Sequence, residues 1–181
     1  MKRKNINSKE GFTIIEVVLV LAIAGLIFLM VFIALPALQR SQRDTQRRDD
    51  MARFLSQLNQ YQANNGGRVP EGVDGYNKET TSGSGSSTTK TRTGLIPEYL
   101  EAGGDTFNDP STGSPYQVMA VNPCPTSGDC GNKSRTDSEM GHIYVYTNAK
   151  CEGENPVYIQ GNRKIAITLK LEGAGIYCGN S

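Results

Sequence analysis

Glu16 is the residue of this sequence whose position most clearly calls for a chemical role. Its carboxylate lies between Ile15 and Val17, at the start of an uncharged apolar segment that continues to Leu35. Holding an ionised carboxylate in hydrocarbon costs about 2.5–3.5 kcal/mol on insertion scales, so such residues usually have a function. The chemistry available to Glu16 is charge pairing with a cation that shares its apolar surroundings.

Four cysteines form the second group of reactive side chains, and all lie in the C-terminal third: Cys124, Cys130, Cys151 and Cys178. None belongs to a Cys-x-x-Cys pair, and a single histidine cannot complete a common Cys/His zinc set. Beyond a membrane-targeting segment, an even number of cysteines favours disulfides formed in an oxidising compartment. Three pairings are open. We favour Cys124–Cys130 and Cys151–Cys178, because each closes a loop that contains turn residues.

The other candidates for catalysis or metal binding are weak. His142 is the only histidine, and its spacing groups no nucleophile, base and orienting acid around it, so we expect an exposed, structural side chain. Clustered acids such as Asp105 and Asp109 offer oxygen ligands for calcium, but their spacing matches no EF-hand loop. The sequence therefore predicts a protein that is not an enzyme and that holds no metal or cofactor.

A helix must position Glu16. With the apolar residues before it, the segment is long enough to span about 30 Å of hydrocarbon as a helix. Gly25 lies inside the segment and Pro36 ends it; both weaken an isolated helix, although membrane helices tolerate them. The helical pattern then resumes and continues to about Asn64, where two asparagines and two glycines end it. This second half carries one apolar stripe at three- and four-residue spacing: Met51, Phe54, Leu55, Leu58 and Tyr61.

A basic stretch follows the apolar segment and contains Arg40, Arg43, Arg47, Arg48 and Arg53. Binding to nucleic acid is one interpretation of such a stretch. The formal net charge is only +1, and acids are interleaved with the arginines, so a solvated or intersubunit face is favoured. Two pairs lie one helical turn apart with the acid first, Asp44 with Arg48 and Asp49 with Arg53.

The rest of the chain predicts a small head. The chain of 181 residues suits one modest domain with an appendage. Residues 71–93 are rich in Gly, Ser and Thr and predict an exposed loop. Strand-like runs follow at 116–121, 142–147, 157–159 and 164–171. The economical arrangement is a small antiparallel sheet with one face on the amphipathic helix, which makes the fold class α+β.

The segment 10–16 has the sequence EGFTIIE and resembles the prepilin peptidase motif of the type IV pilin family. The resemblance implies cleavage between Gly11 and Phe12 on the cytoplasmic side of the membrane, followed by N-methylation of Phe12. Cleavage would make Phe12 a cation, and Glu16 of one subunit could neutralise the amine of a neighbour inside an apolar filament core. Removing one member of such a buried pair typically costs about 3–5 kcal/mol.

The resemblance to type IV pilins and major pseudopilins extends further along the chain. Residues 65–70 look like the helix exit of those families, although Val69 replaces the usual aromatic residue. Residues 108–116 are similar to the turn that leads into their sheet, and 178–181 to the cysteine-bearing tail of many pilins. In relatives, the helix between breakers comparable to Gly25 and Pro36 can unwind on assembly. The alternative is that Gly25 is only a small packing residue and that Pro36 only kinks the helix.

The resemblance implies a type IV pilin fold with four parts. They are a leader (1–11), a transmembrane and filament-core helix (12–36), an amphipathic helix (37–65) and a disulfide-bearing head (66–181). It also implies a single-pass membrane protein, with its C-terminal domain outside the cytoplasm, that assembles into an extracellular pilus for adhesion, motility or DNA uptake. The implied partners are identical subunits, prepilin peptidase with its methyltransferase activity, and the inner-membrane assembly machinery.

Three alternatives stay open at this point. A pseudopilin of a secretion or competence system would share the N-terminal motif, but the disulfide-bearing tail favours a pilin. A monomeric, membrane-anchored binding module would use its helix only as a tether. A secreted enzyme with a cleaved signal would begin near Leu38 or later. Against it, a conventional secretory signal keeps its apolar core free of charge and is followed by a small-residue cleavage site.

Overall fold

A computed structural model describes residues 11–82, 89–126, 128–137, 139–161 and 163–181. In these residues one long helix, α1, precedes short strands and two short helical turns, so the predicted α+β class is confirmed. The chain divides into two units, Met1–Gln39 and Arg40–Ser181. Of the predicted leader, only Gly11 lies within the described residues.

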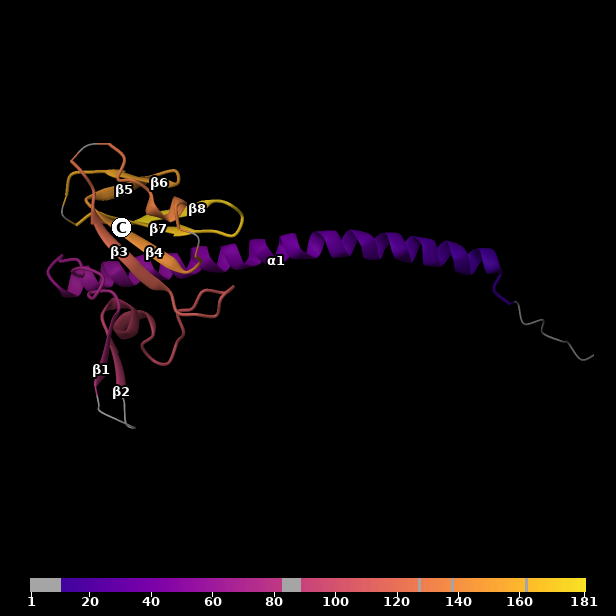
Figure 1. Cartoon of the computed structure of the whole chain (residues 1–181), viewed down its shortest axis with the longest axis horizontal. Helices are drawn as coiled ribbons and strands as arrows, with labels where there is room; N and C mark the ends of the chain where they lie inside the picture. Colours follow the sequence, from indigo (N-terminus) through magenta and orange to yellow (C-terminus); the bar gives the residue numbers. More distant parts are fainter. Residues whose placement is uncertain (1–10, 83–88, 127, 138, 162) are drawn as a thin grey trace, which may run out of the picture. The chain divides into compact units, whose positions relative to one another are not determined.

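Helix α1 covers Ile14–Asn64 (Figure 1), which confirms the predicted long helix and its end. In the first unit its apolar side chains are exposed, and the helix is long and apolar enough there to cross a membrane. Neither Gly25 nor Pro36 interrupts it. Because proline has no N–H, the carbonyl of Phe32 lacks its usual intrahelical partner. The predicted role of both positions in assembly stays a prediction.

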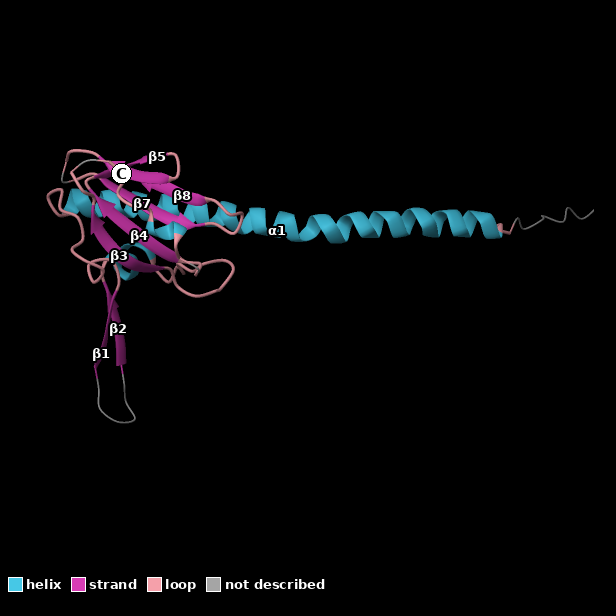
Figure 2. Ribbon diagram, turned by 45° about the horizontal axis from the view of Figure 1, so that its top comes forward, coloured by secondary structure: helices cyan, strands magenta, loops and turns pink. Residues whose placement is uncertain are grey.

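In the second unit, α1 packs on a four-stranded sheet of order β3-β4-β7-β8 (Figure 2). The strands are β3 (Gln117–Pro123), β4 (His142–Thr147), β7 (Ile165–Lys170) and β8 (Ile176–Asn180). Two of the three pairings are antiparallel, but β3 and β4 run parallel, which the sequence did not predict. The long connection between them passes through the short turn η2 (Lys133–Arg135). The connection covers residues 124–141, which is long enough for the crossover that two parallel strands need.

The main core lies between α1 and one face of this sheet. On the helix, Met51, Phe54 and Leu58 are fully buried, and Leu55 and Tyr61 pack against them half-buried, so the predicted stripe is confirmed. The sheet contributes alternate residues of β4 and β7, among them Ile143, Val145, Ile165, Ile167 and Leu169. Burial of such side chains contributes about 1.5–3 kcal/mol each.

The second face of the sheet is covered as well. Thr168 of β7 is buried on this face, and its hydroxyl lies 2.6 Å from that of Ser134. Tyr146 and Ala166 are buried on the same side. The cover includes the two-stranded sheet of β5 (Ala149–Glu152) and β6 (Asn155–Tyr158). A strand covered on both faces loses the outward polar positions that an exposed strand has.

The region predicted as an exposed loop contains a β-hairpin. Strands β1 (Lys78–Ser82) and β2 (Thr89–Thr93) pair antiparallel, and every residue of β1 is exposed. The strands were not predicted, and the predicted exposure holds for β1 but is wrong for Tyr76 of the same region, which is buried. Threonine favours strands, but a polar ribbon lacks the apolar alternation that marks a strand in a sequence. At its base the chain continues into the short helical turn η1 (Ile96–Leu100).

Tyr76, beside this hairpin, is fully buried, and among the described residues its hydroxyl has no hydrogen-bond partner. Burial raises the pKa of Tyr76. Tyr76→Phe should leave the free energy of unfolding unchanged or increase it by about 1 kcal/mol, because an unsatisfied buried group is removed. The matched control is Tyr116→Phe, because the Tyr116 hydroxyl donates to Asp50 Oδ2 at 3.1 Å. It should lose about 1–2 kcal/mol. Thermal unfolding of both variants measures the two changes in stability. Equal destabilisation by Tyr76→Phe and Tyr116→Phe would contradict the prediction.

Candidate functional site

The segment around Gly11, Phe12 and Glu16 forms the start of α1. Residues 11–13 are not helical, and the Phe12 side chain is 88% exposed. Glu16 lies in the first turn of the helix. A shallow groove beside it is lined by Phe12, Glu16, Val17, Val20 and Leu21. The predicted cleavage position therefore precedes the helix, and the predicted assembly charge lies in its first turn, next to apolar side chains.

Thr13 completes this site, and sequence reasoning gave it no role. The backbone N–H of Thr13 donates to Glu16 Oε2 at 3.1 Å, and the Thr13 hydroxyl donates to the same oxygen at 3.0 Å. In return the N–H of Glu16 donates to Thr13 Oγ1 at 3.4 Å. This is a capping box, in which a Thr before the helix and a Glu three residues later satisfy each other's exposed donors. The Thr-x-x-Glu spacing was the signal that could have revealed it.

Arg47 connects α1 to the head through hydrogen bonds to residues of its loops. Its side chain is fully buried, so the predicted solvated basic face is wrong at this position. The guanidinium donates to both carboxylate oxygens of Asp109 at 2.6 and 3.0 Å. It also donates to Asp44 at 2.9 Å, to Glu172 at 3.0 Å and to Ser111 at 2.6 Å. Burial of a guanidinium is tolerated because its fork is bidentate to one carboxylate and bonded to further acceptors.

The neighbours of Arg47 extend this cluster and correct two predicted helix pairs. Arg43 donates to both oxygens of Glu172 at 2.8 and 2.6 Å. Asp44 pairs with Arg47 and not with Arg48, and it also accepts two backbone N–H groups, from Glu172 and Gly173. The predicted pair of Asp49 with Arg53 is likewise replaced, because Arg53 contacts Asp50 and Asp105. In both cases a partner three residues away on α1 replaces the one predicted four residues away, and residues of the head add further contacts.

The charges of this cluster lower two acid pKa values. Burial alone would raise the pKa of Asp109, but hydrogen bonds from Arg47 and Ser111 bring it down to about 2. The Arg43 hydrogen bonds, assisted by Arg47 and opposed by partial burial, lower the pKa of Glu172 to about 2. Asp109 was considered as a calcium ligand in the sequence; in the structure its carboxylate is occupied by Arg47, Ser111 and the backbone of Thr112.

Acid should therefore destabilise the head. The folded pKa values of Asp109 and Glu172 lie below the ordinary values of about 3.9 and 4.3, so the unfolded chain takes up protons first as the pH falls. Their contribution is complete above about pH 5 and is lost between about pH 5 and 2. Burial raises the pKa of Asp50, which opposes part of this trend. Melting temperatures across this range should fall steeply in the native protein and less in Asp109→Asn; equal slopes would contradict the assignment.

His142 is half-buried and paired, so the prediction of an exposed histidine is corrected. Its Nδ1 lies 2.7 Å from Asp137 Oδ2, and its Nε2 lies 3.2 Å from Glu139 Oε2. The Tyr144 hydroxyl donates to the same Asp137 oxygen at 2.7 Å. Despite the burial of Asp137, these bonds and that from the backbone of Glu139 lower its pKa. The cluster fastens the start of β4 to the segment before it, and its acids come from a loop that sequence spacing does not place.

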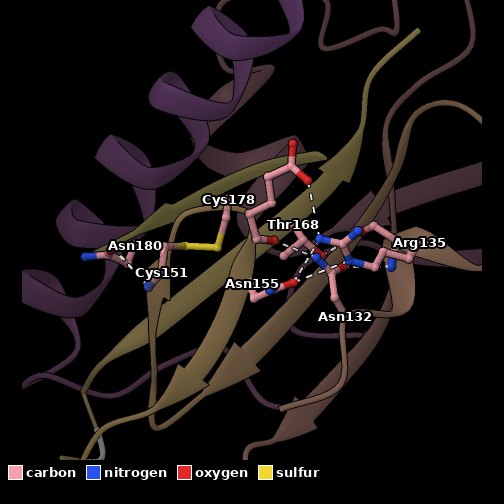
Figure 3. Close-up of a disulfide and its surroundings, with 9 residues drawn as sticks. Asn132, Arg135, Cys151, Asn155, Thr168, Cys178 and Asn180 are labelled. Carbon is pink, nitrogen blue, oxygen red and sulfur yellow. Dashed lines mark hydrogen bonds and ion pairs between the residues drawn. A yellow bond between two sulfur atoms is a disulfide. The ribbon is translucent and has the colours of Figure 1, made fainter. Parts of the chain in front are cut away.

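Both favoured disulfides are present. Cys124 is bonded to Cys130, and Cys151 to Cys178, and no cysteine is free. Figure 3 shows the second bridge, which joins β5 to β8, with the side chain of Asn180 beside it accepting the N–H of Cys151 at 3.3 Å. The bridge therefore fastens the last strand of the sheet to the layer that covers it. A loop of this size contributes about 3.5 kcal/mol on the chain-entropy account.

Comparison of the chain with known protein families, with curated proteins and with solved structures finds no match. The described residues include no group of three or more His, Cys, Asp or Glu side chains arranged to hold a metal ion. What the site can do chemically therefore rests on its own geometry. It offers an exposed peptide before a helix, one carboxylate in the first turn and a helix surface of exposed apolar side chains.

Proposed function

We propose that this chain is the precursor of a type IV pilin, cleaved after Gly11, N-methylated at Phe12 and polymerised through the first half of α1. The observation that carries the proposal is the exposed apolar helix with a single carboxylate, Glu16, in its first turn. A helix of this composition needs a lipid or protein environment, and within either environment the carboxylate needs a cation. The new amino group of Phe12 in a neighbouring subunit supplies one.

The head supports the same proposal. A disulfide-bearing α+β unit follows the apolar helix, and one N-terminal helix could span a membrane. Disulfides form in oxidising compartments, which favours a head outside the cytoplasm both before assembly and in a surface filament. Identical subunits, prepilin peptidase and the assembly machinery are the proposed partners. Adhesion, motility or DNA uptake would then be activities of the filament as a whole.

The test is the N-terminus of the mature chain. Mass spectrometry of native material should find a protein that begins with methylated Phe12 and lacks the mass of residues 1–11. The uncleaved precursor, from cells without the processing enzyme, is the control. A native chain that retains Met1, or that begins near Leu38, would refute the proposal, since the second result is expected of a secreted protein with a removed signal.

Two other functions use the same N-terminal features. A pseudopilin of a secretion or competence system would be processed identically, and the Cys151–Cys178 bridge near the C-terminus favours the pilin. A monomeric binding module with a tether would retain a spanning helix without needing Glu16. Nucleic acid is a weaker candidate ligand, because Arg43 and Arg47 of the basic stretch are engaged by Glu172 and Asp109.

A further inference from the structure

The two oxygens of the Glu16 carboxylate have different surroundings. Oε2 accepts both the backbone N–H and the hydroxyl of Thr13, at 3.1 and 3.0 Å. Oε1 accepts no hydrogen bond from any described residue. The carboxylate is therefore held back against the first turn of α1 by one oxygen, and the other oxygen keeps its lone pairs for a further donor.

Thr13 is well suited to hold the side chain in this way. It lies between Phe12, the proposed new N-terminus, and the first helical residue, Ile14. Its backbone N–H is one of the donors that a helix start leaves without an intrahelical partner. A glutamate three residues later has the length to reach that donor, and the Thr13 hydroxyl adds a second one. Together they reduce the rotamers open to Glu16 before any partner arrives.

We infer that Thr13 is a positioning residue: it holds Glu16 Oε2 and leaves Oε1 to receive the amino group of Phe12 from a second copy of this chain. The inference rests on the proposed function and adds a requirement to it. A carboxylate with two donors already in place is less costly to keep in an apolar environment than a bare one. It is also oriented when the neighbour's cation arrives, so less rotamer freedom is lost on pairing.

Competitive incorporation tests this role. Tagged variants are expressed as a minority beside the untagged native chain, and the tagged fraction in sheared filaments is divided by that in the membrane. Thr13→Val keeps the shape and loses the hydroxyl, and Thr13→Ser keeps the hydroxyl. Thr13→Val should incorporate about fivefold less than Thr13→Ser, the usual scale of losing one hydrogen bond to the Glu16 carboxylate. Mass spectrometry must show both variants inserted and beginning at Phe12.

A second comparison separates positioning from simple helix capping. In the Glu16→Gln background the carboxylate is gone, so Thr13→Val and Thr13→Ser should incorporate equally. A fivefold difference that persists there would assign Thr13 to capping alone and overturn the inference. Equal incorporation of the two single variants beside normal native filaments would also overturn it, while leaving the proposed function intact. If the native chain forms no filament and keeps Met1, the proposed function fails, and the inference fails with it.

Discussion

Glu16→Gln should reduce filament yield at least about 100-fold while leaving membrane insertion intact, because a buried pair that loses one partner costs about 3–5 kcal/mol. Glutamine has nearly the same shape as glutamate and carries no charge, so insertion into hydrocarbon becomes easier. On the proposed function, the variant loses the partner for the positive Phe12 amine of the neighbouring subunit. The measurement is the ratio of sheared extracellular protein to membrane-bound protein in cells that express only the variant.

The side chain at position 16 also offers a charge-retaining control. Glu16→Asp keeps the carboxylate but is too short to reach Thr13 in the same way, so it should assemble less than the native chain and more than Glu16→Gln. Cleavage before Phe12 is followed in each variant, so that a processing defect is not mistaken for an assembly defect. Filaments of Glu16→Gln at native yield would favour the tether interpretation, in which α1 serves only as an anchor.

Arg47→Ala should lower the free energy of unfolding of the head by about 3–5 kcal/mol, the scale of breaking a buried ion pair. Without Arg47 the Asp109 carboxylate, fully buried in the structure, keeps, among the described residues, only the donors from Ser111 and Thr112. Arg47→Lys should recover only part of the loss, since an ammonium cannot donate the bidentate fork. Thermal and urea unfolding of the full chain in detergent, followed by near-ultraviolet circular dichroism, measure the effect.

Arg48→Ala is the matched control, because Arg48 is the adjacent arginine on the same helix and its side chain is exposed. An exposed position of this kind usually changes stability by no more than about 0.5 kcal/mol. Each of the two variants removes one positive charge from the chain, so an effect of net charge on stability would appear in both. Similar unfolding curves for Arg47→Ala and Arg48→Ala would contradict the structural role of the Arg47 cluster.

Much of the fold could be predicted from local sequence patterns. The 3.6-residue period of Met51, Phe54 and Leu58 predicted the helix and the face that it buries, and β4 was predicted with its observed bounds. The hairpin of β1 and β2 was missed because its residues are polar on both faces. The Thr13–Glu16 pair has the short Thr-x-x-Glu spacing of a capping box, so it could also have been predicted from the sequence.

What the sequence determined by itself is local: an apolar helix with one carboxylate near its start, an amphipathic continuation, and an even set of cysteines. These follow from composition and from spacings within a few turns, so they need no knowledge of the fold. The tertiary structure alone decided the pairing of Arg47 with Asp109 and Glu172, which are 62 and 125 residues away along the chain, and the parallel pairing of β3 with β4. Such contacts depend on which distant loops pack against the helix. Burial then makes the charge pair that forms there stronger than the exposed pairs that helix spacing favours.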